Sequence, residues 1–191
     1  AAIVSGDQLV TYLAKALEAE VVAVGSNVDG VLVSGRPLQS ISRKDLPEFE
    51  GAIGGSAGFS AFMRSLGDSE TRLDRKEPEL NEATPGDLRD TTTPVAMTQS
   101  LKKVLLDDGL PATAQATLKQ WMLDDQVAGA LLRAALPADW KIADKTGAGG
   151  HGSRSIIAVI WPPARQPLVV SIYITQTKAP MAESNQAIAR I

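Results

Sequence analysis

The chain has 191 residues, of which 44% are hydrophobic and 21% charged, and its formal net charge is −3. This composition fits a globular protein of one or two domains and excludes a disordered chain. The sequence contains no apolar run of the roughly 20 residues that cross a bilayer, and no basic stripe that would bind nucleic acid. Because the chain has no cysteine and a single histidine, His151, a disulfide framework is excluded and no metal or other cofactor is expected.

Hydrophobic spacing and turn residues divide the N-terminal part into short elements. A helix is predicted at residues 5–18, because a Ser-x-x-Gln capping box precedes leucines that recur at every fourth position. Short valine-rich strands are predicted at residues 21–24 and 31–33, on either side of an Asn-Val-Asp-Gly turn. The polar, proline-containing stretch at residues 35–50 is predicted to be a connection.

The middle of the chain is predicted to be helical on both sides of one long loop. The predicted helices are one that begins after Gly54-Gly55 and ends near Leu66, one that opens at Thr93-Pro94, and two at residues 114–124 and 127–136. The polar loop at residues 67–92 separates the first two, and its acidic side chains outnumber its basic ones by eight to four. A compact domain rarely carries so long a loop unless the loop has a function.

The hydrophobic period changes after the last of these helices. Strands are predicted at residues 141–145, 155–161 and 168–174, joined by Gly-rich and Pro-rich turns, and a helix at residues 181–191 closes the chain. The C-terminal part is therefore predicted to contain a sheet packed with helices.

Two residues of the acidic loop are spaced for general-base chemistry. Glu77 and Asn81 are four residues apart, so one helical turn would place both side chains on one face. A carboxylate beside an amide can hold a water molecule and take its proton. The peptide bond between Glu77 and Pro78 precedes a proline, where the cis form costs little free energy. The simpler interpretation of the loop by itself is a solvated, charged segment.

A second candidate site lies at the predicted end of the first C-terminal strand. Lys145-Thr146-Gly147 offers a cation, a hydroxyl and a glycine that lets a ligand approach, which suits an anionic substrate. Arg154 lies on the facing strand and could clamp a carboxylate. By itself the tripeptide also fits an ordinary turn.

Taken together, these features resemble the C-terminal part of a class A β-lactamase. The matching motifs, in chain order, are Gly58–Arg64, Thr71–Arg75, Glu77–Asn81, Pro85–Pro94, Gln120–Met122, Ala143–Gly149 and Met181–Glu183. The resemblance covers about residues 56–191, and the runs 149–154 and 170–173 are similar to carbenicillin-hydrolysing members. It implies an α/β (α+β) fold with an antiparallel sheet and packed helices, a β-lactam substrate, no cofactor and a periplasmic location, although no signal peptide is recognised at the start of the chain.

The resemblance also implies a role for each matching residue. Glu77 would be the general base for the deacylating water, which Asn81 would hold. Arg75 and Asp90 would form the ion pair that pins the loop. The substrate contacts would come from the second candidate site, in which Lys145 and Thr146 orient the substrate carboxylate and Gly147 also belongs to the binding residues. Arg154 would be an accessory cation and the Ala148 N–H one of two oxyanion-hole donors.

The sequence departs from the family pattern where the nucleophile is expected. A class A enzyme needs a serine in S-x-x-K and a second motif, S-D-N, both upstream of the glutamate loop, and residues 1–57 contain neither. The S-x-x-K that the chain does contain, Ser100–Lys103, lies after the loop in a predicted structural helix. Because loss of the nucleophile costs on the order of 10⁶ in turnover, the chain is expected to be inactive by itself.

Residues 1–55 resemble a different family. Their Gly-Asp, helix, hydrophobic strand and Asn-Val-Asp-Gly order is similar to the nucleotide-side segment of amino-acid kinases, of the isopentenyl phosphate kinase type, with Asn27 where that pattern has an aspartate. The glycine loop and catalytic lysines of those kinases are absent. A helix–strand–strand unit that simply packs is the plainer interpretation. The join would fall near residues 51–56, so the chain is interpreted as a chimera, natural or engineered, whose N-terminal segment replaces the usual N-terminal half.

Several functions stay open at this point. The chain could be an inactive β-lactamase-derived domain, a module that binds a β-lactam without hydrolysing it, or a nucleotide-binding kinase remnant. It could also self-associate, or complement a second chain that supplies the serine.

Overall fold

A computed structural model of the chain describes residues 2–3, 31–33, 36–38 and 55–191. The predicted helix at residues 5–18, the strand at 21–24 and the turn at 27–30 lie outside these ranges. Strand β2 (Val31–Val33) forms as predicted, and it pairs antiparallel with β3 (Arg36–Leu38). The expectation of a plain connection at residues 35–50 is therefore wrong for residues 36–38.

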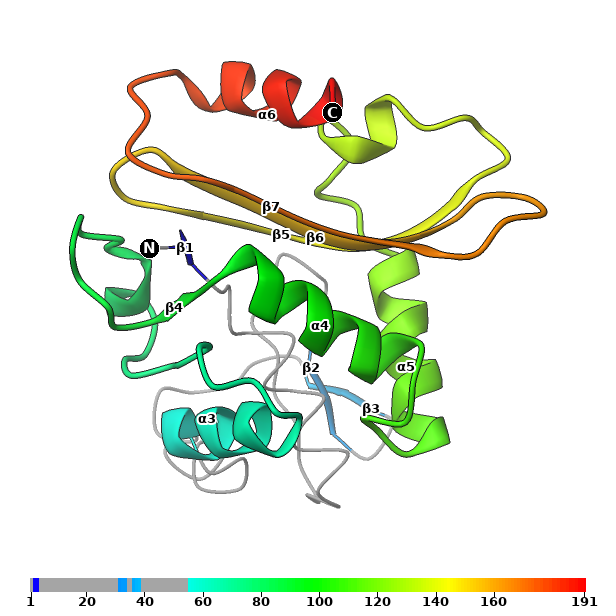
Figure 1. Ribbon diagram of the computed structural model, residues 1–191, viewed down its shortest axis with the longest axis horizontal. Coiled ribbons are helices and arrows are strands. Elements are labelled where there is room, and N and C mark those ends of the chain that lie inside the picture. The colour runs from blue at the N-terminus through cyan, green and yellow to red at the C-terminus, as the bar shows by residue number, and fades with distance from the viewer. Residues whose placement is uncertain (1, 4–30, 34–35, 39–54) are drawn as a thin grey trace.

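The main sheet has three antiparallel strands in the order β5–β6–β7. The strands are β5 (Lys141–Gly149), β6 (Ser153–Trp161) and β7 (Leu168–Ile174). The central strand β6 is a nearly continuous apolar run that is buried on both faces, because helices cover the sheet from both sides (Figure 1). The register places Thr146 opposite Ile156 and Ala148 opposite Arg154.

Four helices of the described part surround this sheet. They are α3 (Gly55–Ser65), α4 (Pro94–Leu105), α5 (Ala112–Leu123) and α6 (Met181–Ala189). Helices α4 and α5 lie on one face of the sheet, with α3 beyond α4, and α6 lies on the other face (Figure 1). Each face has its own apolar cluster, one around Phe59, Leu101 and Val159 and one around Leu131, Ile156 and Ile188. The predicted α/β class with an antiparallel sheet and packed helices is confirmed.

Helix α4 begins where its sequence signals indicate. Pro94 occupies the first turn, and the Thr93 side chain accepts a hydrogen bond from the Ala96 N–H at 3.2 Å. The acidic loop before it, residues 67–92, contains a short 3₁₀ helix η1 (Glu79–Asn81) and ends in β4 (Thr91–Thr92), which pairs with β1 (Ala2–Ile3).

Two predictions about the C-terminal part are wrong. Residues 127–136 form no α-helix but only the 3₁₀ helix η2 (Leu132–Ala134), because the Asp125 side chain takes the N–H groups of Val127 and Ala128 into a turn. Strand β5 also runs four residues beyond Lys145 to Gly149, because its glycines still pair with serines of β6. Lys145-Thr146-Gly147 is thus inside the strand, not at its end or in a turn.

No helix among the described residues is long and apolar enough to cross a membrane.

Candidate active site

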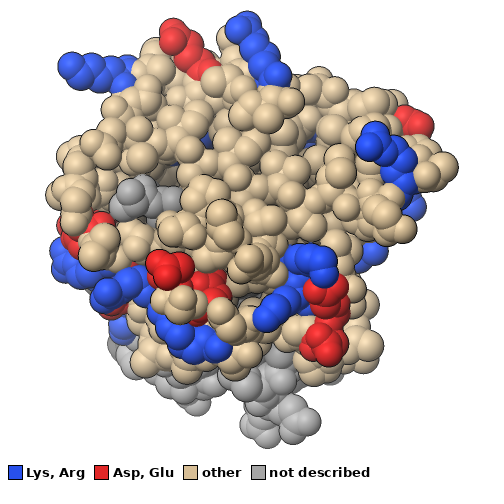
Figure 2. Space-filling view, in the orientation of Figure 1, with Lys and Arg blue, Asp and Glu red and all other residues tan. Residues whose placement is uncertain are grey.

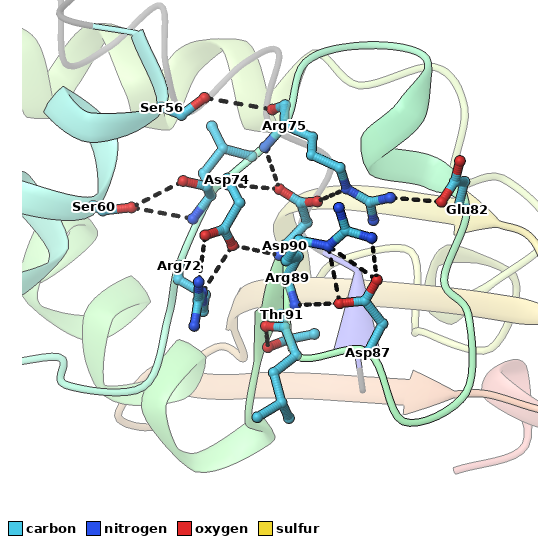
Figure 3. A network of polar contacts seen from close by, with 12 residues as sticks. Ser56, Ser60, Arg72, Asp74, Arg75, Glu82, Asp87, Arg89, Asp90 and Thr91 are labelled. Carbon is cyan, nitrogen blue, oxygen red and sulfur yellow. Dashed lines mark hydrogen bonds and ion pairs between the residues drawn. The ribbon is translucent and has the colours of Figure 1, made fainter.

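The acidic loop is held by a network of charged groups around Asp90 (Figure 3). The Asp90 carboxylate is buried and accepts hydrogen bonds from the backbone N–H groups of Asp74 and Arg75 at 2.7 and 2.9 Å. It also forms an ion pair with Arg75 Nε at 2.5 Å, and this bond raises the pKa of the Arg75 guanidinium. Glu82 binds the other side of the same guanidinium at 2.6 Å. The structure therefore brings together the predicted loop pair, Arg75 and Asp90.

Helix α3 holds the first part of the same loop through two serines (Figure 3). Ser60 Oγ accepts from the Leu73 N–H at 3.1 Å and donates to the Leu73 carbonyl at 3.2 Å. Ser56, one turn earlier, donates to the Arg75 carbonyl at 3.5 Å. The sequence reasoning missed both serines, although their spacing of four residues places them on one helix face.

Glu77 and Asn81 come together as their spacing predicts. Helix η1 places Asn81 one turn after Glu77, and Asn81 Nδ2 donates a hydrogen bond to Glu77 Oε2. The peptide bond between Glu77 and Pro78 is cis. Leu80 is 3% exposed and anchors the turn in the core. Glu77 is exposed, so the anchored turn presents its carboxylate to the surface.

The backbone of this turn is tied to the end of strand β5. The Gly150 N–H donates to the Asn81 carbonyl at 2.8 Å. A Cβ atom at Gly150 would lie 2.3 Å from the Glu82 carbonyl oxygen, so this approach requires glycine. The segments that carry the two candidate sites, far apart in the sequence, are therefore in direct contact.

The second candidate site lies along β5, an edge strand of the described sheet. Thr146 and Gly147 are buried, Lys145 is half-buried and Ala148 is exposed. Lys145 Nζ donates to the Thr146 carbonyl at 2.8 Å. Because side chains alternate along a strand, Lys145 lies on the α4 face of the sheet while Thr146 and Ala148 lie on the α6 face.

Arg154 lies across from Ala148 and is held by two contacts. Its Nε donates to Asn185 Oδ1 of α6 at 2.8 Å, and its Nη1 donates to the Gly147 carbonyl at 3.1 Å. Burial lowers the pKa of this guanidinium. The shallow hollow beside it is lined by Gly147, Ala148, Ser153, Arg154, Ser155, Tyr173 and Ile174. Asn185 was missed by the sequence reasoning, because no motif links it to Arg154.

Ser100 is not placed as a nucleophile. Its side chain is buried and its Oγ donates to Asp68 Oδ2 at 2.9 Å, while Lys103 Nζ donates to the Leu66 carbonyl instead of approaching Ser100. Asp68 also accepts from Thr71 Oγ1 at 2.5 Å, so the serine belongs to a buried structural cluster.

The distribution of charged side chains bears on nucleic-acid binding and on metal binding. On the face shown in Figure 2, basic and acidic side chains alternate and form no continuous basic area. In the part of the chain that the structure describes, no group of three or more metal-ligating side chains comes together.

Comparison with known proteins identifies similar chains. The model of the family described as "Beta-lactamase enzyme family" matches residues 51–191. Beta-lactamase AER-1 of Aeromonas hydrophila is 76% identical over 140 residues, 73% of this chain and 46% of AER-1. Beta-lactamase CARB-3 of Pseudomonas aeruginosa is 54% identical over 140 residues, 73% of this chain and 49% of CARB-3. The chain thus spans about half the length of the curated relatives it matches.

Solved structures of β-lactamases also superpose on this chain. An ancestral class A β-lactamase superposes with a TM-score of 0.73 and 49% identity, over 75% of this chain and 55% of that chain. The chromosome-encoded β-lactamase of Vibrio parahaemolyticus superposes with a TM-score of 0.78 and 35% identity, over 96% of this chain and 78% of that chain.

Proposed function

The chain belongs to the β-lactamase enzyme family, with a C-terminal part of class A type, and from this we propose that residues 56–191 form the β-lactam-recognition and water-activation half of a β-lactam-hydrolysing site. The observation that carries the proposal is the Asn81–Gly150 hydrogen bond of 2.8 Å. It brings the turn that carries Glu77 into contact with the end of the strand that carries Lys145–Ala148.

The water-activating role rests on the Glu77 turn. The Glu77 carboxylate is exposed and its Oε2 is oriented by Asn81 Nδ2, which is the arrangement a general base needs. When a second chain supplies the acylated serine, Glu77 would take a proton from a water molecule that Asn81 positions. The water oxygen would bond to the acyl carbon, the ester C–O bond would break, and the proton would pass to the released serine oxygen.

The recognition role rests on strand β5 and its neighbour. Lys145 supplies positive charge at the strand edge, Thr146 supplies a hydroxyl and the Ala148 N–H supplies one oxyanion donor. Arg154, fixed by Asn185 and by the Gly147 carbonyl, adds a second cation for the carboxylate of the β-lactam.

Acylation is the step that this chain lacks. Its S-x-x-K serine, Ser100, is buried against Asp68, and the sequence contains no S-D-N. We therefore propose that the 191-residue chain binds a β-lactam at its C-terminal half but forms no acyl-enzyme and does not turn the drug over. A join between two segments near residues 51–56 is part of this proposal. The start of the family match at residue 51 supports it, whereas the superposition of the Vibrio parahaemolyticus β-lactamase over 96% of this chain counts against it.

The test combines intact mass, free drug and binding in one sample. After incubation with a penicillin we expect an unchanged protein mass and an unchanged drug concentration, together with amide NMR shifts at residues 146–148. The Lys145→Ala variant should lose these shifts, whereas Lys141→Ala, on the same strand and exposed, should keep them. A covalent adduct or loss of drug would contradict the absence of a nucleophile. Missing shifts in the wild-type chain would contradict the recognition role.

A second candidate is a complementing half, which the match to about half of each relative favours. In that case a polypeptide that spans the N-terminal half of a class A relative, with its serine and lysine, should restore hydrolysis of a chromogenic cephalosporin when mixed with this chain. The Glu77→Gln variant should abolish that hydrolysis. Absence of any hydrolysis in the wild-type mixture would rule this candidate out.

A further inference from the structure

The neck of the acidic loop, where its two legs leave the core, is closed by buried polar side chains that the proposed function does not use. Asp68 and Thr71 lie at the start of the loop, Thr92 lies at its end and Ser100 lies on α4. Each of these residues is no more than 6% exposed. We call the four residues the neck cluster. Because water does not reach them, their polar groups depend on one another for hydrogen bonds.

The Asp68 carboxylate is the acceptor at the centre of the neck cluster. Its Oδ1 accepts the N–H groups of Glu70 and Thr71 at 2.9 and 2.8 Å. Its Oδ2 accepts Thr71 Oγ1 at 2.5 Å and Ser100 Oγ at 2.9 Å. Each oxygen thus has two donors, which fill the positions that an ionised carboxylate offers.

The direction of the remaining hydrogen bond in the neck cluster follows from this arrangement. Thr71 Oγ1 lies 2.6 Å from Thr92 Oγ1, so one of the two hydroxyls donates to the other. A hydroxyl has a single hydrogen, and Thr71 gives its hydrogen to Asp68, because an ionised carboxylate has none to give. Thr92 is therefore the donor. The Thr71 hydroxyl thereby links the end of the loop to the carboxylate at its start.

Further contacts hold the two legs of the loop together between the neck cluster and the Glu77 turn. The Arg72 N–H donates to the Thr91 carbonyl at 3.0 Å, one residue beyond the two threonines. The Asp90 network described above joins the legs again at Arg75. Because Glu77 follows Arg75 by only two residues, the legs lie side by side from the neck almost to the general base.

The loop is attached to the sheet at its base and at its tip. At the base, Ser100 joins the neck cluster to α4, whose apolar side chains pack against β6 and β7 (Figure 1). At the tip, the Asn81 carbonyl accepts the Gly150 N–H just after β5. Glu77 lies between these two attachments along the chain, so its position relative to Lys145 on β5 depends on both.

We propose that Thr71 is a positioning residue for Glu77, because its hydroxyl ties both legs of the acidic loop to the Asp68 carboxylate and, through Ser100, to α4. This inference rests on the proposed role of Glu77 in water activation. Thr71 acts through the backbone of the loop and not on the substrate. Loss of its hydroxyl removes the hydrogen bonds to Asp68 and from Thr92, so the base of the loop can move against α4 and displace the Glu77 carboxylate.

Amide hydrogen exchange of the full chain measures the effect on the Glu77 turn directly. The amides to follow are hydrogen-bonded within the turn or to it, and they belong to Leu80, Asn81, Glu82 and Gly150. Thr71→Val keeps the shape of the side chain without the hydroxyl. It should speed exchange of these amides by about tenfold or more, the effect of losing a hydrogen bond to a charged group. Thr71→Ser keeps the hydroxyl and should restore the wild-type rates.

Two further variants make the exchange measurement specific. Thr92→Val should speed exchange less than Thr71→Val, because Thr71 still donates to Asp68 in that variant. Ile188→Val, which loosens the buried cluster on the α6 face, should leave the four amides at wild-type rates. Wild-type rates in Thr71→Val, or equal acceleration by Ile188→Val, would overturn the proposal. If Thr71→Val does not fold, faster exchange in Thr92→Val than in Ile188→Val supports the proposal, and equal rates overturn it.

The mixture with the N-terminal half of a class A relative adds a kinetic readout. Glu77 is proposed to act in deacylation, so its displacement should lower kcat about tenfold and leave kcat/KM unchanged, because that ratio reports the steps up to acylation. A smaller folded fraction of Thr71→Val would lower both equally, and that result would overturn the proposal. If the wild-type mixture does not hydrolyse the cephalosporin, the proposed role of Glu77 fails, whereas the exchange rates still decide whether Thr71 fixes the turn.

Discussion

Replacing Asp90 by alanine should destabilise the protein strongly, because this carboxylate closes the acidic loop. The side chain is 1% exposed and serves three donors, of which two are backbone N–H groups and one is Arg75 Nε. Each buried donor left without an acceptor costs about 1–3 kcal/mol, and breaking a buried ion pair costs about 3–5 kcal/mol. Glu82 keeps a partner on Arg75, so we expect a loss of about 3 kcal/mol in the free energy of unfolding.

Urea unfolding followed by tryptophan fluorescence measures this loss. Asp90→Asn keeps an acceptor for the two backbone N–H groups and tolerates the positive φ of 56° at this position, so it should lose roughly half as much. Arg89→Ala removes the ion pair to Asp87, in which the arginine is 53% exposed, and should leave the urea unfolding transition nearly unchanged. If Asp90→Ala costs no more than Arg89→Ala, the network does not hold the loop and the reasoning fails.

Two further substitutions examine other contacts of the site. Gly150→Ala should lower the melting temperature and raise amide exchange around Glu82, because its Cβ would lie 2.3 Å from the Glu82 carbonyl oxygen, whereas Gly129→Ala has no neighbour within 4 Å and should be near neutral. Equal effects of the two substitutions would argue against the tight approach. Ser100→Ala should lower the free energy of unfolding, measured with urea, by about 1–2 kcal/mol. It should also weaken the dependence of that free energy on pH in the acid range. Burial by itself would raise the pKa of Asp68, but the hydrogen bonds from Thr71, Ser100 and the Glu70 N–H together lower it, so this contribution to stability is lost as the pH falls below about 3.8. An unchanged pH dependence in the acid range would contradict this role.

Local patterns predicted most elements of the described part. The start of α4 could be read from Thr93 and Pro94, and the pairing of Glu77 with Asn81 follows from their spacing of four residues. These features depend on interactions between residues close in the sequence. The sheet strands were also recognisable, because the apolar run of β6 is typical of a strand covered on both faces.

Features that depend on distant contacts could not be predicted in the same way. The apolar residues at 127–136 have helical spacing, but Asp125 takes two of their N–H groups into a turn. The end of β5 was placed too early because glycines usually break strands, whereas pairing with β6 sustains them here. The hydrogen bond between Asn81 and Gly150 joins positions 69 residues apart, and no local pattern encodes it.

The hairpin tip between β5 and β6 is enclosed from two directions. Gly150 meets the Glu82 carbonyl oxygen, and a Cβ at Gly152, where φ is +68°, would lie 2.0 Å from the Thr177 carbonyl oxygen. Tips of this kind are usually where a domain accepts insertions and fusions. This tip packs between the loop that carries Glu82 and the loop that carries Thr177, so lengthening it would displace both loops. His151, exposed between the two glycines, is where a spectroscopic label would register movement of either loop.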